Sequence, residues 1–455
     1  MLTIFDVYST ASQDLFQSLQ GAGFTHPTVV LEPHGFLPDL VESPFLYFLG
    51  ESGGQKRGRY FNEVPVPDFW EIIGDNQGAR IKDYNREVAR ICYYRPSHQR
   101  IVERVEWLDQ KGQVVTIDRY DQYGRCYAQT TCDGAGAALL TTYYDGDQIE
   151  RVTENHVTGD ILLSLAGQPL QFFKNRLEFY LYYLGVREFD LDRIFFNTLA
   201  TSFSLSIQLS NQGRAGEDVL FWQEPLGDSL PGNMQLILTN DQIRSQKIII
   251  PHQATYERAL QLAPAEKASK FSPLGYLYDI QPREDIRKDA FVLTNSDQIE
   301  SLETLAQALP NVRIRVAALT EMSPKLMSMM RYPNIVLYQN ISQQKIKDLL
   351  AQSSIYLDIN HYAEVQGIVR KAFEQGQVIL GYEHTVHDRR FLAPENCLAK
   401  GNESGLVERI QAIYQSEAAF REALASQVRQ SDALTAEAFA EGLKTVLGED
   451  HDRTE

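Results

Sequence analysis

The feature that most constrains the fold of this chain is a change of hydrophobic pattern that occurs twice along it. The first fifty residues read as strand, helix and strand, in the segments MLTIFDVY, SQDLFQSLQGAG and PTVVLE. Apolar and polar residues then alternate from about residue 59 to residue 165, after which segments of helix and strand length return. Alternation of strands and helices is typical of a parallel sheet, so the sequence predicts an α/β protein with an inserted β domain.

The inserted segment is predicted to be a meander of antiparallel hairpins. Its runs VVTIDRY, CYAQTT, ALLTTYY and IERVTEN are rich in the β-branched and aromatic residues that favour strands. Turn glycines occur at intervals of 12, 12, 10 and 13 residues: Gly112, Gly124, Gly136, Gly146 and Gly159. Short strands at such regular spacing indicate hairpins joined by tight turns.

A single sheet of this kind needs a covering for one face and for its edges. It therefore either packs on the α/β body of the same chain or binds a partner. The length and aromatic content of the meander favour the partner, because large aromatic side chains supply contact area at interfaces. The predicted interface residues are five tyrosines: Tyr120, Tyr123, Tyr127, Tyr143 and Tyr144.

Two Rossmann-like halves are predicted around this insertion, because a chain of 455 residues is too long for one ordinary domain. The segment SKFSPLGYLYDIQPRED, which is rich in turn formers, is the predicted break between the halves. The N-terminal half is expected to comprise residues 1–58 and 166–270, and the meander residues 59–165. The C-terminal half, with closing helices, is expected over residues 283–455.

Composition argues against several classes of protein. The chain has 60 acidic and 43 basic residues, a net charge of −17, whereas a nucleic-acid surface needs a basic footprint. The sequence contains no pattern typical of a signal peptide and no apolar run of membrane-spanning length, so a cytoplasmic protein is expected. The four cysteines form no CxxC pair and are expected to be reduced and structural.

The stretch HYAEVQGIVRKAFEQGQVILG, from His361 to Gly381, has the layout of a sugar-nucleotide site. It reads as a strand end, a loop, a helix and the next strand, and doubly wound sheets bind ligands beyond the carboxyl ends of their strands. The loop from Glu364 to Gly367 leads into a helix whose first amides suit a diphosphate. Gly367 would let the backbone approach a phosphate closely.

Four features together resemble one family of two-domain GT-B glycosyltransferases. They are the MLTIFDVY start, the aromatic meander, FWQEPLGDSLPGNMQLIL and YLDINHYAEVQGIVRKAFEQG. Over essentially its whole length the chain is similar to the non-catalytic subunit of the accessory-Sec O-GlcNAc transferase pair. The resemblance implies a GT-B-like fold, a catalytic sister subunit that binds UDP-GlcNAc, and an unfolded serine-rich repeat adhesin as the acceptor.

The resemblance also implies a role for the chain. It would stabilise the catalytic O-GlcNAc transferase sister subunit, join it through the β-meanders in a hetero-oligomer, and hold the adhesin polypeptide. The coupling of the family to export implies peripheral attachment to the inner face of the cell membrane, which the acidic net charge does not support. No cofactor and no nucleic acid are expected.

The C-terminal half favours the non-catalytic sister. Retaining GT-B relatives usually carry a Glu in the loop and a second Glu eight positions later, and here these positions hold Gln366 and Glu374. Active relatives also place an Arg and a Lys after the first strand of this half. The corresponding segment LTNSDQIESLETL has neither, but contains Asp297, Glu300 and Glu303. A diphosphate leaving group needs cations, so donor chemistry is predicted to be lost.

The predicted vestigial donor pocket consists of His361, Glu364, Gln366, Gly367, Arg370 and Glu374. Arg370 can bind phosphate or pair with Glu374, since the two residues are four positions apart on the predicted helix. Glu364 can replace the missing Glu by a shift of two positions. The sequence leaves both alternatives open.

Two further sets of residues are candidates for binding. His384, His387 and Asp388 can hold a metal ion, but a polar surface loop is the favoured interpretation and no metal site is predicted. The predicted acceptor cleft contains residues at or near strand ends: His34, Gly35, Trp222 and His252. The cleft of a two-domain fold offers a long groove to a disordered polypeptide.

Three functions remain open at the level of the sequence. The favoured one is a non-catalytic subunit that stabilises the transferase and binds its acceptor. The first alternative is an active retaining glycosyltransferase that uses Glu364 and Glu374, which predicts binding of a UDP-sugar by the chain alone. The second is an export chaperone for unfolded adhesin, which predicts acceptor binding without any effect on a transferase.

Overall fold

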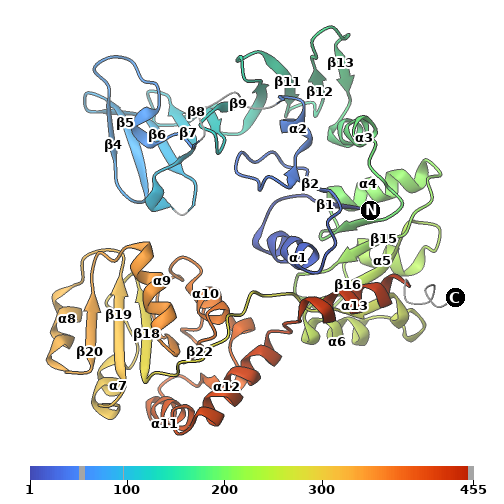
Figure 1. Cartoon of the computed structure of the whole chain (residues 1–455). Coiled ribbons are helices and arrows are strands. Elements are labelled where there is room, and N and C mark those ends of the chain that lie inside the picture. The colour runs from blue at the N-terminus through green and yellow to red at the C-terminus, as the bar shows by residue number, and fades with distance from the viewer. Residues whose placement is uncertain (51–56, 96, 449–455) are drawn as a thin grey trace. The chain divides into compact units, whose positions relative to one another are not determined.

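The computed structural model describes residues 1–50, 57–95 and 97–448 (Figure 1). The chain forms two compact units: the first comprises Met1–Ile250 and Ala254–Pro273, and the second comprises Pro251–Gln253 and the chain from Leu274 onward. Each unit has a hydrophobic core of its own. The predicted domains also include residues 51–56, 96 and 449–455, which lie outside the described residues.

A parallel sheet of seven strands forms the α/β body of the first unit. Its strands lie in the order β17 (Phe271–Pro273), β16 (Ser245–Ile250), β15 (Asp218–Phe221), β14 (Ile194–Phe196), β1 (Leu2–Phe5), β2 (Thr28–Val30) and β3 (Val41–Glu42). All four residues of β1 are buried, as in a strand that is covered on both faces. β1 pairs with β14 in a register that places Leu2 opposite Ile194.

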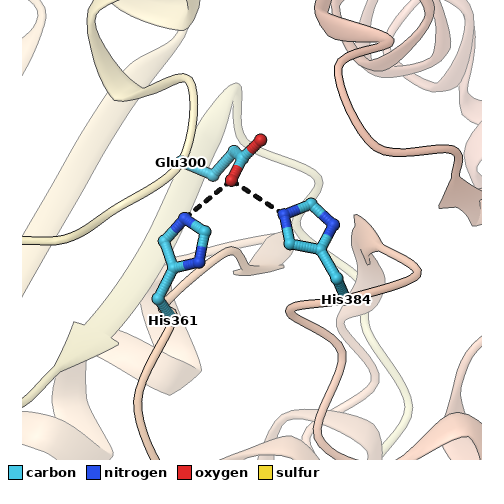
Figure 2. A group of neighbouring side chains, drawn as sticks. All are labelled: Glu300, His361 and His384. Carbon is cyan, nitrogen blue, oxygen red and sulfur yellow. Dashed lines mark hydrogen bonds and ion pairs between the residues drawn. The ribbon is translucent and has the colours of Figure 1, made fainter.

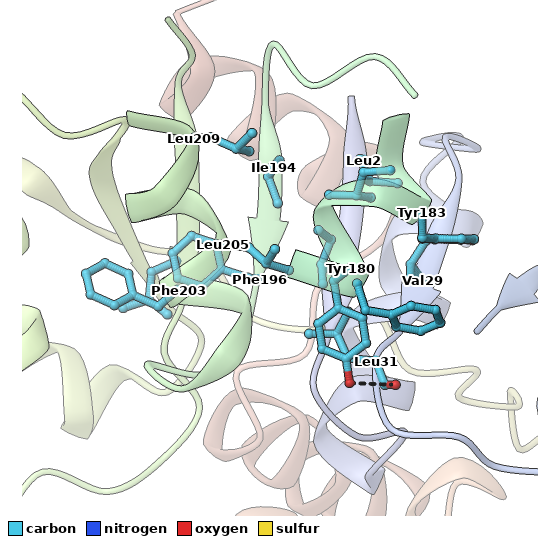
Figure 3. Packing of buried hydrophobic residues seen from close by; sticks show 14 of the residues in the cluster. Leu2, Val29, Leu31, Tyr180, Tyr183, Ile194, Phe196, Phe203, Leu205 and Leu209 are labelled. Atoms are coloured by element: carbon cyan, nitrogen blue, oxygen red, sulfur yellow. Dashed lines mark hydrogen bonds between the residues drawn. The ribbon is translucent and has the colours of Figure 1, made fainter. Parts of the chain in front are cut away.

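Helices connect these strands: α1 (Thr10–Gly21), α2 (Pro44–Tyr47), α3 (Arg176–Val186), α4 (Thr201–Asn211), α5 (Gly232–Thr239), α6 (Gln253–Leu262) and the 3-10 helix η3 (Ala265–Lys270). The side chain of Asn175 caps α3 by accepting a hydrogen bond from the backbone N–H of Glu178. Tyr180 and Tyr183 of α3 are buried in the same core as Val29 (Figure 3). The Tyr180 hydroxyl donates a hydrogen bond to a backbone carbonyl at 3.3 Å, so its polar tip is satisfied inside the core.

The predicted meander is a ten-stranded antiparallel sheet in which each strand pairs with its neighbours in sequence. The strands are β4 (Glu71–Gly74), β5 (Gly78–Asp83), β6 (Arg86–Tyr93), β7 (Val102–Leu108), β8 (Val114–Tyr120), β9 (Cys126–Cys132), β10 (Ala138–Tyr144), β11 (Glu150–Asn155), β12 (Ile161–Leu163) and β13 (Gln171–Phe173), with the 3-10 helices η1 (Phe61–Glu63) and η2 (Ser97–Gln99). β13 lies beyond residue 165, where the sequence places the return to α/β structure, and it extends the sheet by pairing with β12.

Four hairpin turns of the meander repeat at twelve-residue intervals around an aspartate. The Oδ1 atom of each aspartate accepts hydrogen bonds from the backbone N–H groups two and four residues later, as in an Asx-turn: Asp109, Asp121, Asp133 and Asp145. The third residue after each aspartate has a positive φ angle, and it is glycine in three turns and Gln148 in the fourth. The turn predicted at Gly146 is therefore present, but Gln148 takes its left-handed position.

The meander packs on the α/β body of its own chain over part of its length. Side chains of β9–β13, among them Tyr127, Tyr143 and Val152, join the core that contains α3. Side chains of β5–β8 form a separate small core around Ile81 and Ile91. The two interpretations of the meander are therefore not exclusive, because one end is covered by the chain itself while the other end has a core of its own.

A parallel sheet of six strands forms the centre of the second unit. Its strands lie in the order β20 (Ile335–Tyr338), β19 (Arg313–Ala318), β18 (Asp289–Thr294), β21 (Ile355–Asp358), β22 (Val378–Tyr382) and β23 (Cys397–Leu398). Its helices are α7 (Leu302–Ala308), α8 (Pro324–Met327), α9 (Gln343–Gln352), α10 (Ile368–Glu374), α11 (Glu403–Ile413), α12 (Glu417–Gln430) and α13 (Ala436–Leu447), with the 3-10 helices η4 (Ser328–Arg331), η5 (Arg389–Phe391) and η6 (Pro394–Asn396). The predicted α/β fold with an antiparallel insertion is confirmed.

The strand order of the second sheet brings three loops together. Because β18, β21 and β22 are neighbours, the loops that follow these strands share one edge of the sheet.

Across the described ranges, none of the helices combines the length and the apolar character that crossing a bilayer requires.

Candidate functional site

The loop before α10 is the centre of the predicted donor pocket, and its backbone conformation is uncommon. Gln366 and Gly367 have left-handed φ angles of 59° and 62°. Such angles are unfavourable for a residue with a side chain, and the Gln366 side chain is anchored. Its Oε1 accepts a hydrogen bond from Gln343 Nε2 of α9 at 2.7 Å. The amide that replaces the expected carboxylate is thus used in a contact within the protein.

Glu364 uses its carboxylate to cap α10. Its Oε1 accepts a hydrogen bond at 2.8 Å from the backbone N–H of Val369, one of the helix-start amides that a diphosphate would need. The side chain is partly buried, and burial raises the pKa of the Glu364 carboxyl. This geometry supports a structural role for Glu364 and not the alternative in which it replaces the missing Glu.

Arg370 and Glu374 form the ion pair that their spacing allows. Arg370 Nε lies 2.8 Å from Glu374 Oε1, and the Arg370 guanidinium lies 5.4 Å from the centre of the Tyr278 ring. On the same helix, burial lowers the pKa of the Lys371 ammonium. The charge of Arg370 is therefore already balanced within the chain.

The acidic segment after β18 also makes contacts within the chain. Asp297 accepts a hydrogen bond from a serine at the start of α8, and Glu303 pairs with an arginine of η4. Glu300 lies between two histidines: its Oε2 is 2.6 Å from His361 Nε2 and 2.9 Å from His384 Nε2 (Figure 2). This edge thus presents carboxylates and imidazoles where active relatives are expected to carry arginine and lysine.

The metal site considered for the segment HTVHDRRF does not form. His384 contacts Glu300, whereas His387 Nδ1 lies 2.6 Å from Oδ1 of Asp358 at the end of β21. The hydrogen bond to Asp358 raises the pKa of His387 to about 9. Asp388 pairs with a neighbouring arginine. These three residues therefore make separate contacts, and His384 lies beside Glu300, which also contacts His361.

Two of the predicted acceptor residues, His34 and Gly35, line a surface pocket of about 700 Å³ between the α/β body and the meander. The turn after β8 contributes to the same pocket, and Tyr47 and Tyr123, each 39% exposed, also line it. A Cβ atom on Gly35 would lie 2.6 Å from the last carbonyl oxygen of β8, so the close approach of these two segments requires glycine.

The other two predicted acceptor residues, Trp222 and His252, are not lining residues of this pocket. Trp222 follows β15, is only 6% exposed and belongs to the core of the first unit. His252 belongs to the second unit, where its Nδ1 lies 3.9 Å from Asp432 Oδ2 and burial lowers its pKa. The prediction for Trp222 is therefore corrected, because it is a core residue that cannot contact an acceptor. His34 and Gly35 share a pocket.

Three of the five predicted interface tyrosines are core residues as well. Tyr120, Tyr127 and Tyr143 are 5%, 2% and 3% exposed, and the Tyr143 ring packs 4.7 Å from an aromatic ring of α2. These three cannot supply contact area to a partner, because the chain itself buries them. Tyr123 and the partly buried Tyr144 retain accessible surface.

The most exposed aromatic side chains of the meander region are not among the five tyrosines predicted from the sequence. Phe69, before β4, is 90% exposed, and Tyr84, in the turn between β5 and β6, is 84% exposed. Ile73 of the edge strand β4 is 52% exposed. A signal exists for Tyr84, because it stands in the polar turn sequence KDYNRE, where an aromatic ring has no core to enter.

The chain has two α/β units, each built on a sheet of parallel strands, and the first carries the inserted meander. This is the fold of the GT-B-like class, as the solved structures that it resembles also show. Models of the GtfB N-terminal, middle and third domains match residues 2–48, 70–174 and 176–262, and a model of the GftB/GlyA-F C-terminal domain matches residues 290–427. The chain belongs to the GtfB family, which confirms the resemblance predicted from the sequence.

Two relatives are named UDP-N-acetylglucosamine--peptide N-acetylglucosaminyltransferase stabilizing protein GtfB. The protein from Streptococcus gordonii is 49% identical over 451 residues, which cover 99% of this chain and 100% of the relative. The protein from Streptococcus pneumoniae serotype 4 is 46% identical, over 98% of this chain and 100% of the relative. A solved structure of a GtfA/B complex bound to UDP and GlcNAc contains a chain that is 49% identical, with a TM-score of 0.94 over 98% of this chain and 100% of that one.

Proposed function

We propose that this chain is the non-catalytic subunit of a UDP-GlcNAc-dependent peptide O-GlcNAc transferase. It stabilises a GtfA-like catalytic subunit and binds the acceptor polypeptide. The proposal rests on the contacts at the predicted donor pocket. The Glu364 carboxylate caps α10, and Arg370 of this helix is paired with Glu374. The segment from Leu293 to Leu305 contains no Arg or Lys, so its side chains offer no cation to a diphosphate leaving group.

The relatives support the proposed assembly. Two full-length relatives are named as stabilizing proteins of the transferase, and a chain 49% identical to this one occurs in a GtfA/B complex bound to UDP and GlcNAc. The docking surface proposed for the catalytic subunit is the end of the meander with a separate core, which also carries the exposed Phe69, Ile73 and Tyr84. Burial of such side chains provides the free energy of association.

The acceptor is proposed to bind in the pocket that His34 and Gly35 line. Tyr47 and Tyr123 offer exposed rings, and Gln122 adds an amide, so the pocket combines apolar contact with hydrogen-bonding groups. An unfolded serine-rich polypeptide presents backbone amides, carbonyls and short hydroxyl side chains, which suit such a lining. Binding near the catalytic subunit raises the local concentration of acceptor serines at its active site.

The proposed setting of the reaction is the cytoplasm, before export. The acceptor is a serine-rich repeat adhesin that leaves the cell through an accessory Sec system. Peripheral attachment of the complex to the inner face of the membrane is proposed to come from the export machinery, because the chain itself carries a net charge of −17.

The test is transfer of labelled GlcNAc from UDP-GlcNAc to a serine-rich peptide. It compares this chain alone, its catalytic sister alone and the two mixed. The proposal expects no labelling by the chain alone and faster labelling by the mixture than by the sister alone. Labelling by the chain alone would favour the active-transferase alternative, and a mixture no faster than the sister would favour the export chaperone.

Variants then separate docking from acceptor binding. Phe69→Ala with Tyr84→Ala should reduce co-purification with the catalytic sister, whereas Tyr123→Ala should leave the complex intact and weaken peptide binding. Met330→Ala removes an apolar side chain of the second unit that is 62% exposed, and it serves as the matched control. Loss of the complex in the control variant would contradict the proposed docking surface.

A further inference from the structure

Three ligand-type side chains meet at the carboxyl edge of the second sheet. Glu300 follows β18, His361 follows β21 and His384 follows β22, and these three strands lie side by side. Figure 2 shows the two imidazole rings on either side of the Glu300 carboxylate. The three side chains are 17%, 34% and 25% exposed, so solvent ions can reach them.

Backbone contacts fix the positions of the first two residues. The N–H of Glu300 donates to the Ile359 carbonyl at 2.9 Å, and the N–H of His361 donates to the Gln298 carbonyl at 3.2 Å. These hydrogen bonds flank an antiparallel bridge between the two loops. The carboxylate and the first imidazole are therefore held on paired backbones, as a pre-formed site requires.

The third residue stands in a turn that is tied to the same edge. The Thr385 hydroxyl donates to the Asp358 carbonyl at 2.8 Å, which fixes the residue after His384 against the end of β21. The Tyr382 hydroxyl donates to the Ser301 hydroxyl at 2.9 Å and links this turn to the start of α7. The loops that carry all three side chains are thus connected by hydrogen bonds.

The atoms that face one another form a ligand set for a transition metal. Both Nε2 atoms lie near the same oxygen, Glu300 Oε2, and the three ligand atoms are all within 4.8 Å of one another. Ligand atoms of a tetrahedral Zn²⁺ site are roughly 3.3 Å apart, given bonds of about 2.0–2.1 Å, so small rotations of the side chains suffice. Two histidines and one glutamate also form the protein ligands of known Zn²⁺ sites.

We propose that Glu300, His361 and His384 bind one Zn²⁺ ion and leave its fourth coordination position to water or to an anion. The inference goes beyond the proposed function and does not depend on it. It also departs from the expectation that the chain has no metal site. Asp358 and His387 lie on the same edge, but they pair with each other and are not ligands.

The test is isothermal titration calorimetry, in which ZnCl₂ is added to the full, untagged chain after treatment with a chelator. We expect one Zn²⁺ per wild-type chain. His384→Ala should weaken binding by at least about a hundredfold, and Glu300→Gln should do the same. Glu300→Gln keeps an oxygen that accepts the imidazole hydrogen bonds, so this variant controls for loss of folding, which circular dichroism also monitors.

His34→Ala provides the matched control. His34 also lies beside a glutamate, 3.6 Å from Glu103, but in the first unit and outside the three-residue cluster. This variant should bind Zn²⁺ as the wild type does. Replacement of Zn²⁺ by Co²⁺ should give the wild type a tetrahedral visible spectrum that the His384→Ala variant lacks. The absence of saturable binding, or equal affinity in wild type and His384→Ala, would overturn the proposal.

Discussion

Glu364 stands in a loop of the sugar-nucleotide type, yet its carboxylate contributes to folding. Its hydrogen bond to the Val369 N–H satisfies an amide that the start of α10 leaves unpaired. Glu364→Ala should therefore destabilise the second unit by about 0.5–2 kcal/mol, the usual range for loss of a helix cap. Glu364→Gln keeps an acceptor oxygen and should retain most of that stability. Thermal unfolding measures both variants, and equal losses would contradict the capping role.

His387 makes the stability of the second unit depend on pH. Its hydrogen bond to Asp358 raises the pKa of His387 to about 9, above the value of about 6.5 in an unfolded chain. Because the folded state has the higher pKa, this stabilisation is complete below about pH 6.5 and is lost as the pH rises through about 9. The unfolding temperature of the second unit should therefore fall between about pH 7 and about pH 9.

Unfolding scans across this pH range, with a chelator present, measure the effect. His387→Gln removes the titrating group and should flatten the pH dependence. His34→Gln changes a histidine of the first unit and should leave the dependence as it is in the wild type. If the unfolding temperature of His387→Gln depends on pH as strongly as that of the wild type, another group causes the dependence.

Contacts between residues that are close in sequence were predictable, and contacts between distant residues were not. The pair of Arg370 and Glu374 follows from four-residue spacing on one helix. The contact of Glu300 with His361 and His384 joins three loops and depends on the strand order β18-β21-β22. The sequence pattern identifies strands but does not give their spatial order, so it could not reveal this cluster.

At the scale of elements, the meander was predictable because its signals are local. Alternation of period two and regularly spaced turns need no information from the rest of the chain. β13 was not predicted, because a strand of three residues is too short to show alternation and its pairing depends on β12. The burial of Tyr127 and Tyr143 was also hidden, since it depends on which face of the sheet meets α3.

Two turn glycines with the same backbone angle test how the hairpins are built. Gly112 and Gly124 both have a φ angle of 79°. A Cβ at Gly112 would meet nothing within 4 Å, whereas a Cβ at Gly124 would lie 3.1 Å from the backbone nitrogen of Arg59. Gly112→Ala should cost about 1–2 kcal/mol, the penalty for a left-handed L-residue. Gly124→Ala should cost more, because the backbone near Arg59 must also shift.

Urea unfolding followed by tryptophan fluorescence measures both substitutions, because Trp70 and Trp107 lie in the region of the meander. The difference between the two variants measures the contact of the added Cβ with the backbone of Arg57 and Arg59, since the strain from φ is the same in both. Equal destabilisation would mean that the segment around Arg59 yields without loss of stability.

At the scale of the whole molecule, the division into two α/β units was readable from the alternation of strands and helices. Each unit has a hydrophobic core of its own. The alternation of strands and helices in each half of the sequence therefore predicts one unit without information from the other half. The positions of the predicted acceptor residues could not be derived from the sequence pattern. Trp222 and His34 both follow strands of the first sheet, but only the structure separates the core position from the pocket position.

The net charge predicts how the molecule behaves near a membrane. With a net charge of −17, the chain should be repelled by anionic lipid surfaces, which attract clusters of Lys and Arg. In co-sedimentation with vesicles of phosphatidylserine and phosphatidylcholine, we expect the chain alone to stay in the supernatant at low and at physiological salt. Binding that rises as salt falls would point to a basic surface that outweighs the net charge.

One of the two strands that pair with β1 is synthesised much later than β1 itself. β1 pairs with β14, and Leu2 lies opposite Ile194 although the whole meander separates them in sequence. A ribosome adds about 5–20 residues per second, so roughly 10–40 s pass between the two strands. In that interval the hairpins of the meander can form from local contacts, which fold fast. The finished meander shortens the loop that β1 and β14 must close, so the insertion helps to assemble the sheet that it interrupts.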